Sequence, residues 1–484
     1  MIPTSLRRVK SIVWILLILS GPAVAQSYDL VIAGGRVIDP ESKLDAVRSV
    51  GITGGKIRAV TSGKLEGRAA IDARGLIVTP GFIDLHAHGQ DLENYRAQAM
   101  DGVTTALELE VGTGDVDRWY GERAGRSPIH YGASIGHIPV RMQVLGDPGG
   151  MLPTGDAARR AATEEEITEI KRRMERGLAQ GAPAAGFGIQ YTPAASRWEI
   201  LEMFRVAARF GAACHVHMRH MGEESVAGLE ELIAASALTG TPLHLVHVTS
   251  SGLRSTPKLL QMIGEAQARG LDVTTECYPY TAAMTGLESA MFDQGWQKVL
   301  GIDYQDLEWT QTGERLTAES FARYRKTGGM TVMHMIPEPV VRLAVASPLV
   351  MIASDGEIRK GKGHPRASGT FSRVLGLYSR DEQALGWMEA LRKMTLAPAR
   401  RLERRAPMMK DKGRVRVGAD ADLTLFDPAR VRDRATFAEP GLASEGIQYV
   451  LVGGVPVVKA GRLDEAVNPG QPVRTAAGDG AAAR

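Results

Sequence analysis

Cysteine is scarce in this chain of 484 residues, where only Cys214 and Cys277 occur. Both lie in apolar stretches typical of strands, where free thiols are commonly buried. The sequence therefore lacks the disulfide framework that holds small secreted domains together. Two buried thiols are the preferred interpretation, and a single bridge between them stays open if the chain folds in an oxidising compartment.

An excess of charge of one sign is also missing. The chain has 58 basic and 55 acidic residues, a formal net charge of +3, and only 5% aromatic residues. No basic stretch is interleaved with aromatics in the manner of a nucleic-acid groove, so we expect no nucleic-acid partner. With 44% hydrophobic residues, the chain can bury one large core and a smaller companion.

The apolar run at the N-terminus is too short to span a bilayer. Arg7, Arg8 and Lys10 precede an apolar segment at 12–19, and small residues follow up to Ala25. This pattern predicts a signal peptide over 1–25, cleaved after Ala25, and hence a secreted or periplasmic protein without a stable membrane anchor. The paired arginines also allow twin-arginine export beside the general secretory route, although the residues before them match that signal only in part.

The rest of the sequence has the organisation of an α/β protein. Short strands and glycine turns fill 26–78 and return at 406–465, which predicts a small composite β-sandwich built from both ends of the chain. Between them, at 79–405, apolar strands alternate with amphipathic helices, the pattern of a (β/α)8 TIM-type barrel. The clearest helix begins after Thr163, where Glu166 completes a capping box. The Ala- and Gly-rich end, 466–484, is predicted to be disordered.

Two histidines follow the first apolar strand of the central body. His86 and His88 are two residues apart, so on a strand both imidazoles point to the same side and can reach one ion. Alone, such a pair is a weak signal, because many pairs of this spacing are ordinary surface or core histidines. Its value depends on whether other strands end in similar groups.

Three other strands end in suitable ligands: His217, His247 and Asp355 each lie where an apolar strand gives way to a loop. In a barrel these strand ends meet at one face, where catalytic groups are found. The sequence therefore predicts a metal site at that face. His215 and His244 lie deeper in the same strands, and we expect them to be packed core histidines.

Two acids interrupt another apolar strand. Glu108 and Glu110 share one face of the run at 104–112, and a buried carboxylate without a partner is costly. Their presence favours a nearby cation, which one of them could bridge to a second cation. Glu110, nearer the strand end, is the candidate ligand.

The order of these ligands resembles that of the amidohydrolase superfamily, over nearly the whole chain after the signal peptide. Within it the sequence is most similar to the D-aminoacylases, or N-acyl-D-amino-acid deacylases. The motifs that carry this likeness are Gly102 to Thr105, Gly136 to Arg141, His217 to Arg219, Tyr278 to Tyr280 and His364 to Gly376.

The resemblance implies a function as well as a fold. His86 and His88 would bind one metal ion, His217 and His247 a second, and Asp355 would hold the attacking water and move its proton. Zn²⁺ would be the ion, as one or two per chain, although another divalent metal is possible. The reaction would be hydrolysis of a C–N amide bond in a small substrate such as an N-acyl-D-amino acid.

The same resemblance suggests residues that bind the substrate. Arg366, in the His-Pro-Arg motif, would contact the substrate carboxylate through its bidentate guanidinium. Tyr191, Tyr280 and Arg373 are possible helpers. Arg366 could instead simply cover a loop, and Tyr280 could simply pack the barrel.

The chain departs from the D-aminoacylase pattern in two places. No cysteine follows the second barrel strand, where Glu108 and Glu110 lie, and this leaves the number and identity of the metal ions open. No lysine follows His247, where the sequence reads Val-Thr-Ser-Ser.

Two alternatives compete with this interpretation. A cyclic amide or imide hydrolase of the dihydroorotase or hydantoinase type would have a carboxylated lysine after the fourth strand, and 185–191 contains no lysine. A periplasmic solute-binding protein would need no converging histidines. Of these two alternatives, the sequence favours the cyclic amide or imide hydrolase over the solute-binding protein.

Overall fold

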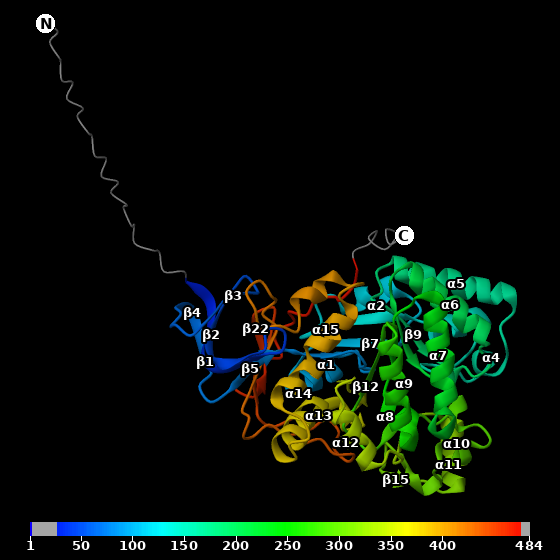
Figure 1. The fold of residues 1–484 in the computed structure, drawn as a ribbon. Helices are drawn as coiled ribbons and strands as arrows, with labels where there is room; N and C mark the ends of the chain where they lie inside the picture. Colours follow the sequence, from blue (N-terminus) through cyan, green and yellow to red (C-terminus); the bar gives the residue numbers. More distant parts are fainter. Residues whose placement is uncertain (2–26, 476–484) are drawn as a thin grey trace.

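The computed structural model describes Met1 and residues 27–475. The remainder of the predicted signal peptide and the segment 476–484 lie outside the described residues. Figure 1 shows two parts side by side, a β-rich part that contains the chain's first strands and a larger part in which helices surround a sheet. No helix in the described part of the chain has the length and apolar character needed to cross a membrane.

The larger part is a parallel barrel, which confirms the predicted fold class. Its eight strands pair in sequence order, and a parallel bridge between Ala87 and Gly356 joins the first strand end to the last. The Asp355 N–H also donates to the His86 carbonyl at 2.6 Å across this junction. The barrel strands are β6 (Phe82–Asp84), β7 (Val103–Thr113), β8 (His130–Gly136), β9 (Ala184–Gly188), β10 (Ala213–His217), β11 (Leu243–Leu245), β12 (Val273–Cys277) and β17 (Val350–Ile352).

Helices connect these strands and cover the outside of the barrel (Figure 1). In α5 the Thr163 hydroxyl accepts from the Glu166 N–H and the Glu166 carboxylate accepts from the Thr163 N–H, so the predicted capping box is present. Its apolar face, with Ile170 and Met174, is buried against the barrel core. The larger helices are α1 (Leu92–Met100), α2 (Val116–Arg123), α3 (His137–Leu145), α5 (Glu164–Ala179), α6 (Arg197–Arg209), α7 (Ser225–Thr239), α9 (Thr256–Ala268), α12 (Glu338–Ala346), α13 (Arg366–Arg373), α14 (Trp387–Met394) and α15 (Leu396–Leu402).

The two ends of the chain build one sheet of nine strands. The antiparallel pairing of β5 with β20, in which Pro80 lies opposite Leu423, joins the N-terminal strands to the C-terminal ones. One buried cluster contains apolar side chains from both segments, including Ile32 and Leu451. The strands are β1 (Tyr28–Asp39), β2 (Leu44–Thr53), β3 (Lys56–Thr61), β4 (Gly67–Asp72), β5 (Ile77–Pro80), β20 (Leu423–Phe426), β21 (Ile447–Val452), β22 (Val455–Lys459) and β23 (Arg462–Leu463).

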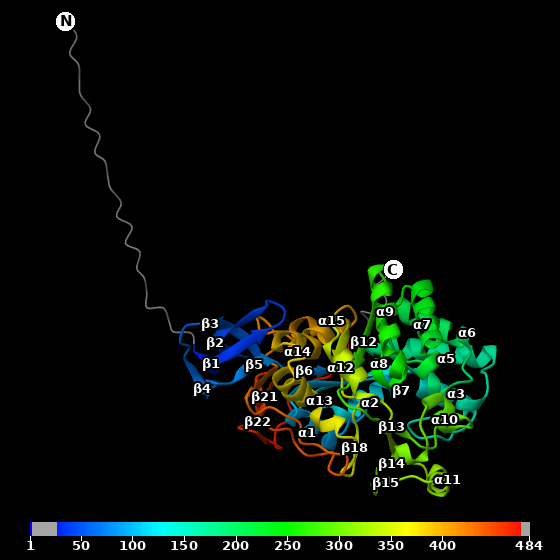
Figure 2. The same ribbon diagram turned by 60° about the horizontal axis from the view of Figure 1, so that its bottom comes forward.

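A separate subdomain interrupts the barrel between β12 and β17. It is a four-stranded antiparallel sheet in the order β13-β16-β14-β15, and Figure 2 shows it with α10 and α11 at one end of the molecule. This subdomain is not predictable from the sequence, because strands of two to four residues carry little periodic signal. Its elements are β13 (Ala283–Gly286), α10 (Trp296–Leu300), β14 (Leu307–Trp309), β15 (Glu314–Arg315), α11 (Ala318–Thr327) and β16 (Met330–Met333).

The prediction of disorder after residue 465 is wrong for 466–475. Val473 is fully buried, its N–H donates to the Tyr131 carbonyl at 2.7 Å, and its carbonyl accepts from the Tyr120 hydroxyl at 2.6 Å. The segment thus pairs beside β8, an arrangement that composition alone does not predict. Cys214 and Cys277 are both free and buried, as the preferred interpretation expected.

Candidate metal centre

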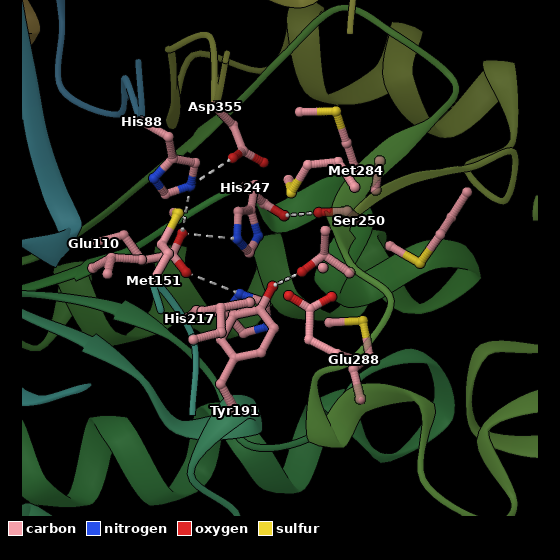
Figure 3. A pocket seen from close by; sticks show the side chains of 18 of the residues that line it. His88, Glu110, Met151, Tyr191, His217, His247, Ser250, Met284, Glu288 and Asp355 are labelled. Carbon is pink, nitrogen blue, oxygen red and sulfur yellow. Dashed lines mark hydrogen bonds and ion pairs between the residues drawn. The ribbon is translucent and has the colours of Figure 1, made fainter. Parts of the chain in front are cut away.

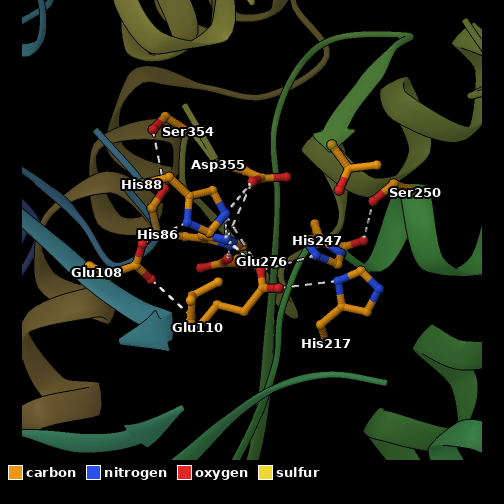
Figure 4. A network of polar contacts seen from close by, with 12 residues as sticks. His86, His88, Glu108, Glu110, His217, His247, Ser250, Glu276, Ser354 and Asp355 are labelled. Atoms are coloured by element: carbon orange, nitrogen blue, oxygen red, sulfur yellow. Dashed lines mark hydrogen bonds and ion pairs between the residues drawn. The ribbon is translucent and has the colours of Figure 1, made fainter. Parts of the chain in front are cut away.

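The strand ends that carry the candidate ligands converge at one mouth of the barrel (Figure 4). Two groups of potential ligand atoms lie there, each with all its atoms within 4.8 Å of one another. They share one residue, Glu110 of β7. The first group is His86, His88, Glu110 and Asp355, and the second is Glu110, His217 and His247.

Glu110 lies between the two groups. Its Oε2 is 2.7 Å from Nε2 of His86 and 3.4 Å from Nε2 of His247, and its Oε1 is 3.2 Å from Nδ1 of His217. A β-carbon at Gly186 of β9 would lie 2.2 Å from the Glu110 carbonyl oxygen, so only glycine allows the two strands this close. One carboxylate therefore faces both groups, as a bridging ligand would.

Each of the four histidines is held through one ring nitrogen and presents the other to the centre. Metal-binding histidines typically have this arrangement, because a partner on the far nitrogen fixes the ring and its tautomer. The pairs are His86 Nδ1 with Glu276 Oε1 at 2.6 Å, His88 Nδ1 with Glu108 Oε2 at 2.6 Å, His217 Nε2 with Gln190 Oε1 at 2.7 Å, and His247 Nδ1 with Ser251 Oγ at 3.1 Å.

Asp355 completes the first group from the end of β17, the strand next to β6 in the closed barrel. Its Oδ1 is 3.0 Å from His88 Nε2 and its Oδ2 is 2.9 Å from Arg366 Nη1. The backbone at Asp355 (φ 52°) and at His247 (φ 33°) lies in the left-handed region. Non-glycine residues adopt it rarely, and such strain concentrates at functional sites.

The site carries an excess of negative charge. Burial disfavours the imidazolium form, but Asp355, Glu110 and Glu276 outweigh it and raise the pKa of His86 well above its usual value. Against the same burial penalty, Glu108 raises the pKa of His88 to about 10. Carboxylates that raise histidine pKa values in this way stabilise positive charge, whether it is a proton or a metal cation.

His217 and Glu110 are in a state that suits metal coordination. Burial lowers the pKa of His217, which favours the neutral imidazole that coordinates metals. His217 Nδ1 and Glu110 Oε2 are buried and form no well-aligned hydrogen bond among the described residues, although each faces another candidate ligand, Glu110 Oε1 at 3.2 Å and His86 Nε2 at 2.7 Å. Buried polar atoms of this kind are expensive unless something binds them. Imidazole nitrogens with carboxylate oxygens fit a divalent cation such as zinc.

A cavity of about 170 Å³ opens over these ligands (Figure 3). Tyr191 lines it, and the Tyr191 hydroxyl lies 3.0 Å from Thr285 Oγ1 in the subdomain between β12 and β17. Ser250 and several methionines line it as well. The cavity thus has the candidate ligands on one side and the subdomain on the other.

The other residues suggested for substrate binding lie outside this cavity. Tyr280 and Arg373 both contact Asp433 Oδ2, at 3.3 and 3.0 Å, and neither lines the cavity. Asp433 occupies their polar ends, so the structure does not support the suggestion for these two. Arg366 is fully buried behind Asp355, with its guanidinium 4.4 Å above the Tyr278 ring.

Some functional positions were missed by the sequence analysis. Glu276 of β12 contacts His86 through Oε1 and His244 Nε2 through Oε2, the latter at 3.0 Å. His244 is thus no ligand, but it supports the carboxylate that holds His86. An acid inside an apolar strand was the available signal, the same one that singled out Glu110. His215 is buried, with its ring 4.6 Å from that of His244.

The structure also bears on the carboxylated lysine expected in cyclic amide hydrolases. β9, the fourth barrel strand, reads Ala-Ala-Gly-Phe-Gly and has no lysine. Glu110 of the second strand is instead the carboxylate shared by the two groups of potential ligand atoms.

Comparison with known proteins agrees with this geometry. The model of the Amidohydrolase family matches residues 69–458. A D-aminoacylase of Alcaligenes xylosoxydans xylosoxydans is 31% identical over 90% of this chain and 95% of its own length. The crystal structure of an N-acyl-D-glutamate deacylase from Bordetella bronchiseptica, complexed with zinc and a phosphonate inhibitor, superimposes with a TM-score of 0.78 at 27% identity, covering 93% of this chain and 100% of that one. A D-aminoacylase with a binuclear metal centre gives 0.79 at 27% identity, with the same coverage. The chain therefore belongs to the amidohydrolase family.

Proposed function

We propose that this chain is a zinc-dependent hydrolase that removes the acyl group from N-acyl-D-amino acids. The observation that carries the proposal is the set of four histidines, each fixed by a protein oxygen and each directed with its free nitrogen toward Glu110 or Asp355. The relatives named above, which are D-aminoacylases and an N-acyl-D-glutamate deacylase, support this choice of substrate.

The proposed ligands are His86 and His88 for one ion, His217 and His247 for another, and Glu110 as the bridge. When bound, a divalent cation supplies Lewis acidity that makes water nucleophilic at neutral pH and polarises the substrate carbonyl. Whether one ion or two are needed for turnover is tested by titrating the metal-free protein with zinc.

Asp355 is the group that moves protons. Burial opposes its ionisation, but the charges of Arg366 and His86 outweigh this effect and lower its pKa. Asp355 is therefore a carboxylate at neutral pH, able to accept the proton of the attacking water and then to deliver it to the leaving nitrogen. Its contact with His88 holds it beside the first group of ligands.

The sequence points to Arg366 as an anchor for the substrate carboxylate, but it is fully buried behind Asp355 and does not line the cavity, so its proposed role is to hold Asp355. Its Nε and Nη2 are buried and have no hydrogen-bond partner in the described part of the chain. The positive charge of Arg366 keeps Asp355 ionised and holds it in place. Tyr191, which lines the cavity, is the proposed contact to the amide.

A substrate panel tests this function. Zinc-loaded protein is assayed against N-acetyl-D-amino acids, their L-enantiomers, dihydroorotate and hydantoins, before and after chelation. We expect hydrolysis of the D-series, loss on chelation and recovery with zinc. Turnover confined to the cyclic amides, or activity that survives complete removal of metal, would overturn the proposal.

We also propose that the protein is exported. Support comes only from the sequence of residues 1–25, in which basic residues precede a short apolar run and a small-residue cleavage site. The test is N-terminal sequencing of protein from a bacterial periplasmic extract. A mature protein that begins at Gln26 would support export, and uncleaved protein in the cytoplasm would exclude it.

A further inference from the structure

The cavity wall that faces the metal centre is unusually rich in methionine. Methionine is flexible and polarisable, so such a wall adapts to unbranched apolar chains. Most of these side chains come from the subdomain between β12 and β17, and none contributes to the ligand groups. The methionines that line the cavity are Met151, Met221, Met284, Met291, Met330, Met333 and Met335.

Glu288 interrupts this apolar wall. It lines the same cavity, and Figure 3 shows its carboxylate near Tyr191, on the side away from His88 and Asp355. The other acids that line the cavity, Glu110 and Asp355, belong to the metal centre. Glu288 is thus the acid of the cavity lining that belongs to neither group of candidate metal ligands.

The position of Glu288 is fixed by its surroundings. The Gly329 N–H donates to Oε2 at 3.0 Å. A β-carbon at Gly286 would lie 3.2 Å from the same oxygen, so the backbone packs closely around the carboxylate. No hydrogen bond to Oε1 is found among the described residues.

No cation neutralises Glu288 within the described part of the chain, where it forms no ion pair. Arg359 is the basic side chain that lines this cavity besides the histidines, and it pairs with Glu357 at 2.7 Å. Arg325 and Lys326 line a neighbouring hollow that Glu288 also borders, and Arg325 is paired with Asp293. A half-buried carboxylate in an apolar wall, with no counter-ion, favours a ligand that brings the positive charge.

From this we infer that the enzyme selects N-acyl amino acids whose side chain is an apolar stem ending in a cation, such as an ammonium or guanidinium group. The methionines contact the methylene groups of the stem, and Glu288 receives the charged end. An acidic side chain would meet the Glu288 carboxylate and be disfavoured. This inference rests on the proposed deacylase function and names its substrate class.

The experiment compares three substrates of the metal-loaded enzyme: N-acetyl-D-lysine, N-acetyl-D-norleucine, which has a similar stem without the charge, and N-acetyl-D-glutamate. We expect kcat/KM for the lysine substrate to exceed that for norleucine by roughly tenfold or more, with glutamate the slowest. In Glu288→Gln the ratio of lysine to norleucine should fall toward one, and the relative rate on glutamate should rise.

A matched control is Glu319→Gln, the same substitution at an exposed position of α11 that does not line the cavity. It should keep the wild-type order of substrates. Hydrolysis with no preference for lysine over norleucine, or a ratio that Glu288→Gln leaves unchanged, would overturn the inference while the deacylase function stands. If none of the N-acetyl-D-amino acids is hydrolysed, the proposed function itself fails.

Discussion

Two buried clusters in this molecule combine histidine with carboxylate, at different ends of the barrel. At the mouth lies the candidate metal centre. At the start of β8, His130 Nε2 lies 3.1 Å from Asp422 Oδ1, and Lys412 Nζ lies 2.7 Å from Asp422 Oδ2. This second cluster joins the barrel to the nine-stranded sheet, since Asp422 immediately precedes β20.

The two clusters differ in how the hydrogen-bonding atoms of their histidines and acids are satisfied. In the second cluster, Asp422 Oδ1 also accepts from the Gly453 N–H, and His130 Nδ1 accepts from the Gln471 N–H. At the mouth, Glu110 Oε2 and His217 Nδ1 are buried, form no well-aligned hydrogen bond among the described residues, and face other candidate ligands. Buried histidines and acids therefore do not by themselves indicate a metal site. Converging ligand atoms that face one another without well-aligned hydrogen bonds do.

The largest effect expected is that of Asp355→Asn on turnover. The amide cannot accept the proton of the attacking water, so kcat should fall by about 10³-fold. His86, His88, Glu110, His217 and His247 remain, so bound metal should stay close to the wild-type amount. Steady-state kinetics measure kcat, and elemental analysis of the same preparation measures the bound metal. A near-normal rate would remove Asp355 from the mechanism.

Asp422→Asn should act on stability instead. Burial raises the pKa of Asp422, but His130 and Lys412 outweigh it and lower the pKa, so the folded protein contains an ionised, paired carboxylate. Its loss removes one of the two carboxylate partners of Lys412, since Asp420 Oδ2 remains at 3.0 Å, and should cost about 1 to 3 kcal/mol in the free energy of unfolding. Denaturant unfolding measures this cost. Metal bound per folded molecule should not change. A loss of metal would show that the second cluster also contributes to metal binding, contrary to this account.

Lys393 offers a third kind of buried charge, bound to the Val345 and Ser347 carbonyls rather than to an acid. Burial lowers its pKa from 10.5 to about 8. Between these values the unfolded chain holds the proton and the folded chain does not, so the free energy of unfolding should rise from pH 8 to 10.5. The rise should be on the order of 3 kcal/mol.

The control for this prediction is Lys393→Met, which has no charge to titrate at that position. The wild type should gain stability relative to this variant as the pH increases through the interval. If the two unfolding curves remain parallel over the whole interval, the Lys393 ammonium is not destabilised by burial.

The smallest expected effect is that of Glu276 on metal affinity. Glu276 contacts His86 but is not itself one of the candidate metal ligands. Glu276→Gln should weaken metal affinity by about 10 to 100-fold, because the ring of His86 loses its charged partner. Competition with a chelator of known affinity measures this change. Glu199→Gln is the control, since Glu199 also contacts a buried histidine, His137, at 2.8 Å and pairs with the buried Arg141, and none of these residues belongs to the ligand groups. Equal losses in both variants would mean that Glu276 acts only through stability.

Much of the fold could be predicted from the sequence because its signals are local. Capping at Thr163, the 3.6-residue apolar period of α5 and the apolar barrel strands each appear within a short window. The ligands could be proposed because polar residues at the ends of barrel strands must meet at one face. Contacts between residues that are distant in the sequence leave no such local signal and could not be predicted.

Glu276 illustrates this limit. Its sequence neighbours indicate only a buried acid in a strand, whereas its function depends on His86, 190 positions earlier. The contacts of Tyr280 and Arg373 with Asp433 of the C-terminal segment could not be predicted for the same reason. The subdomain with Glu288 was missed because its strands are too short to show a period.

Metal content tests the central claim most directly. Protein purified without added metal, then loaded with zinc and freed of excess ions, should retain one or two zinc ions per chain by elemental analysis. Glu110→Ala should lose at least one of them, and His130→Gln should lose none. Wild-type protein that binds no zinc under these conditions, or a Glu110→Ala variant that binds as much as the wild type, would contradict the account.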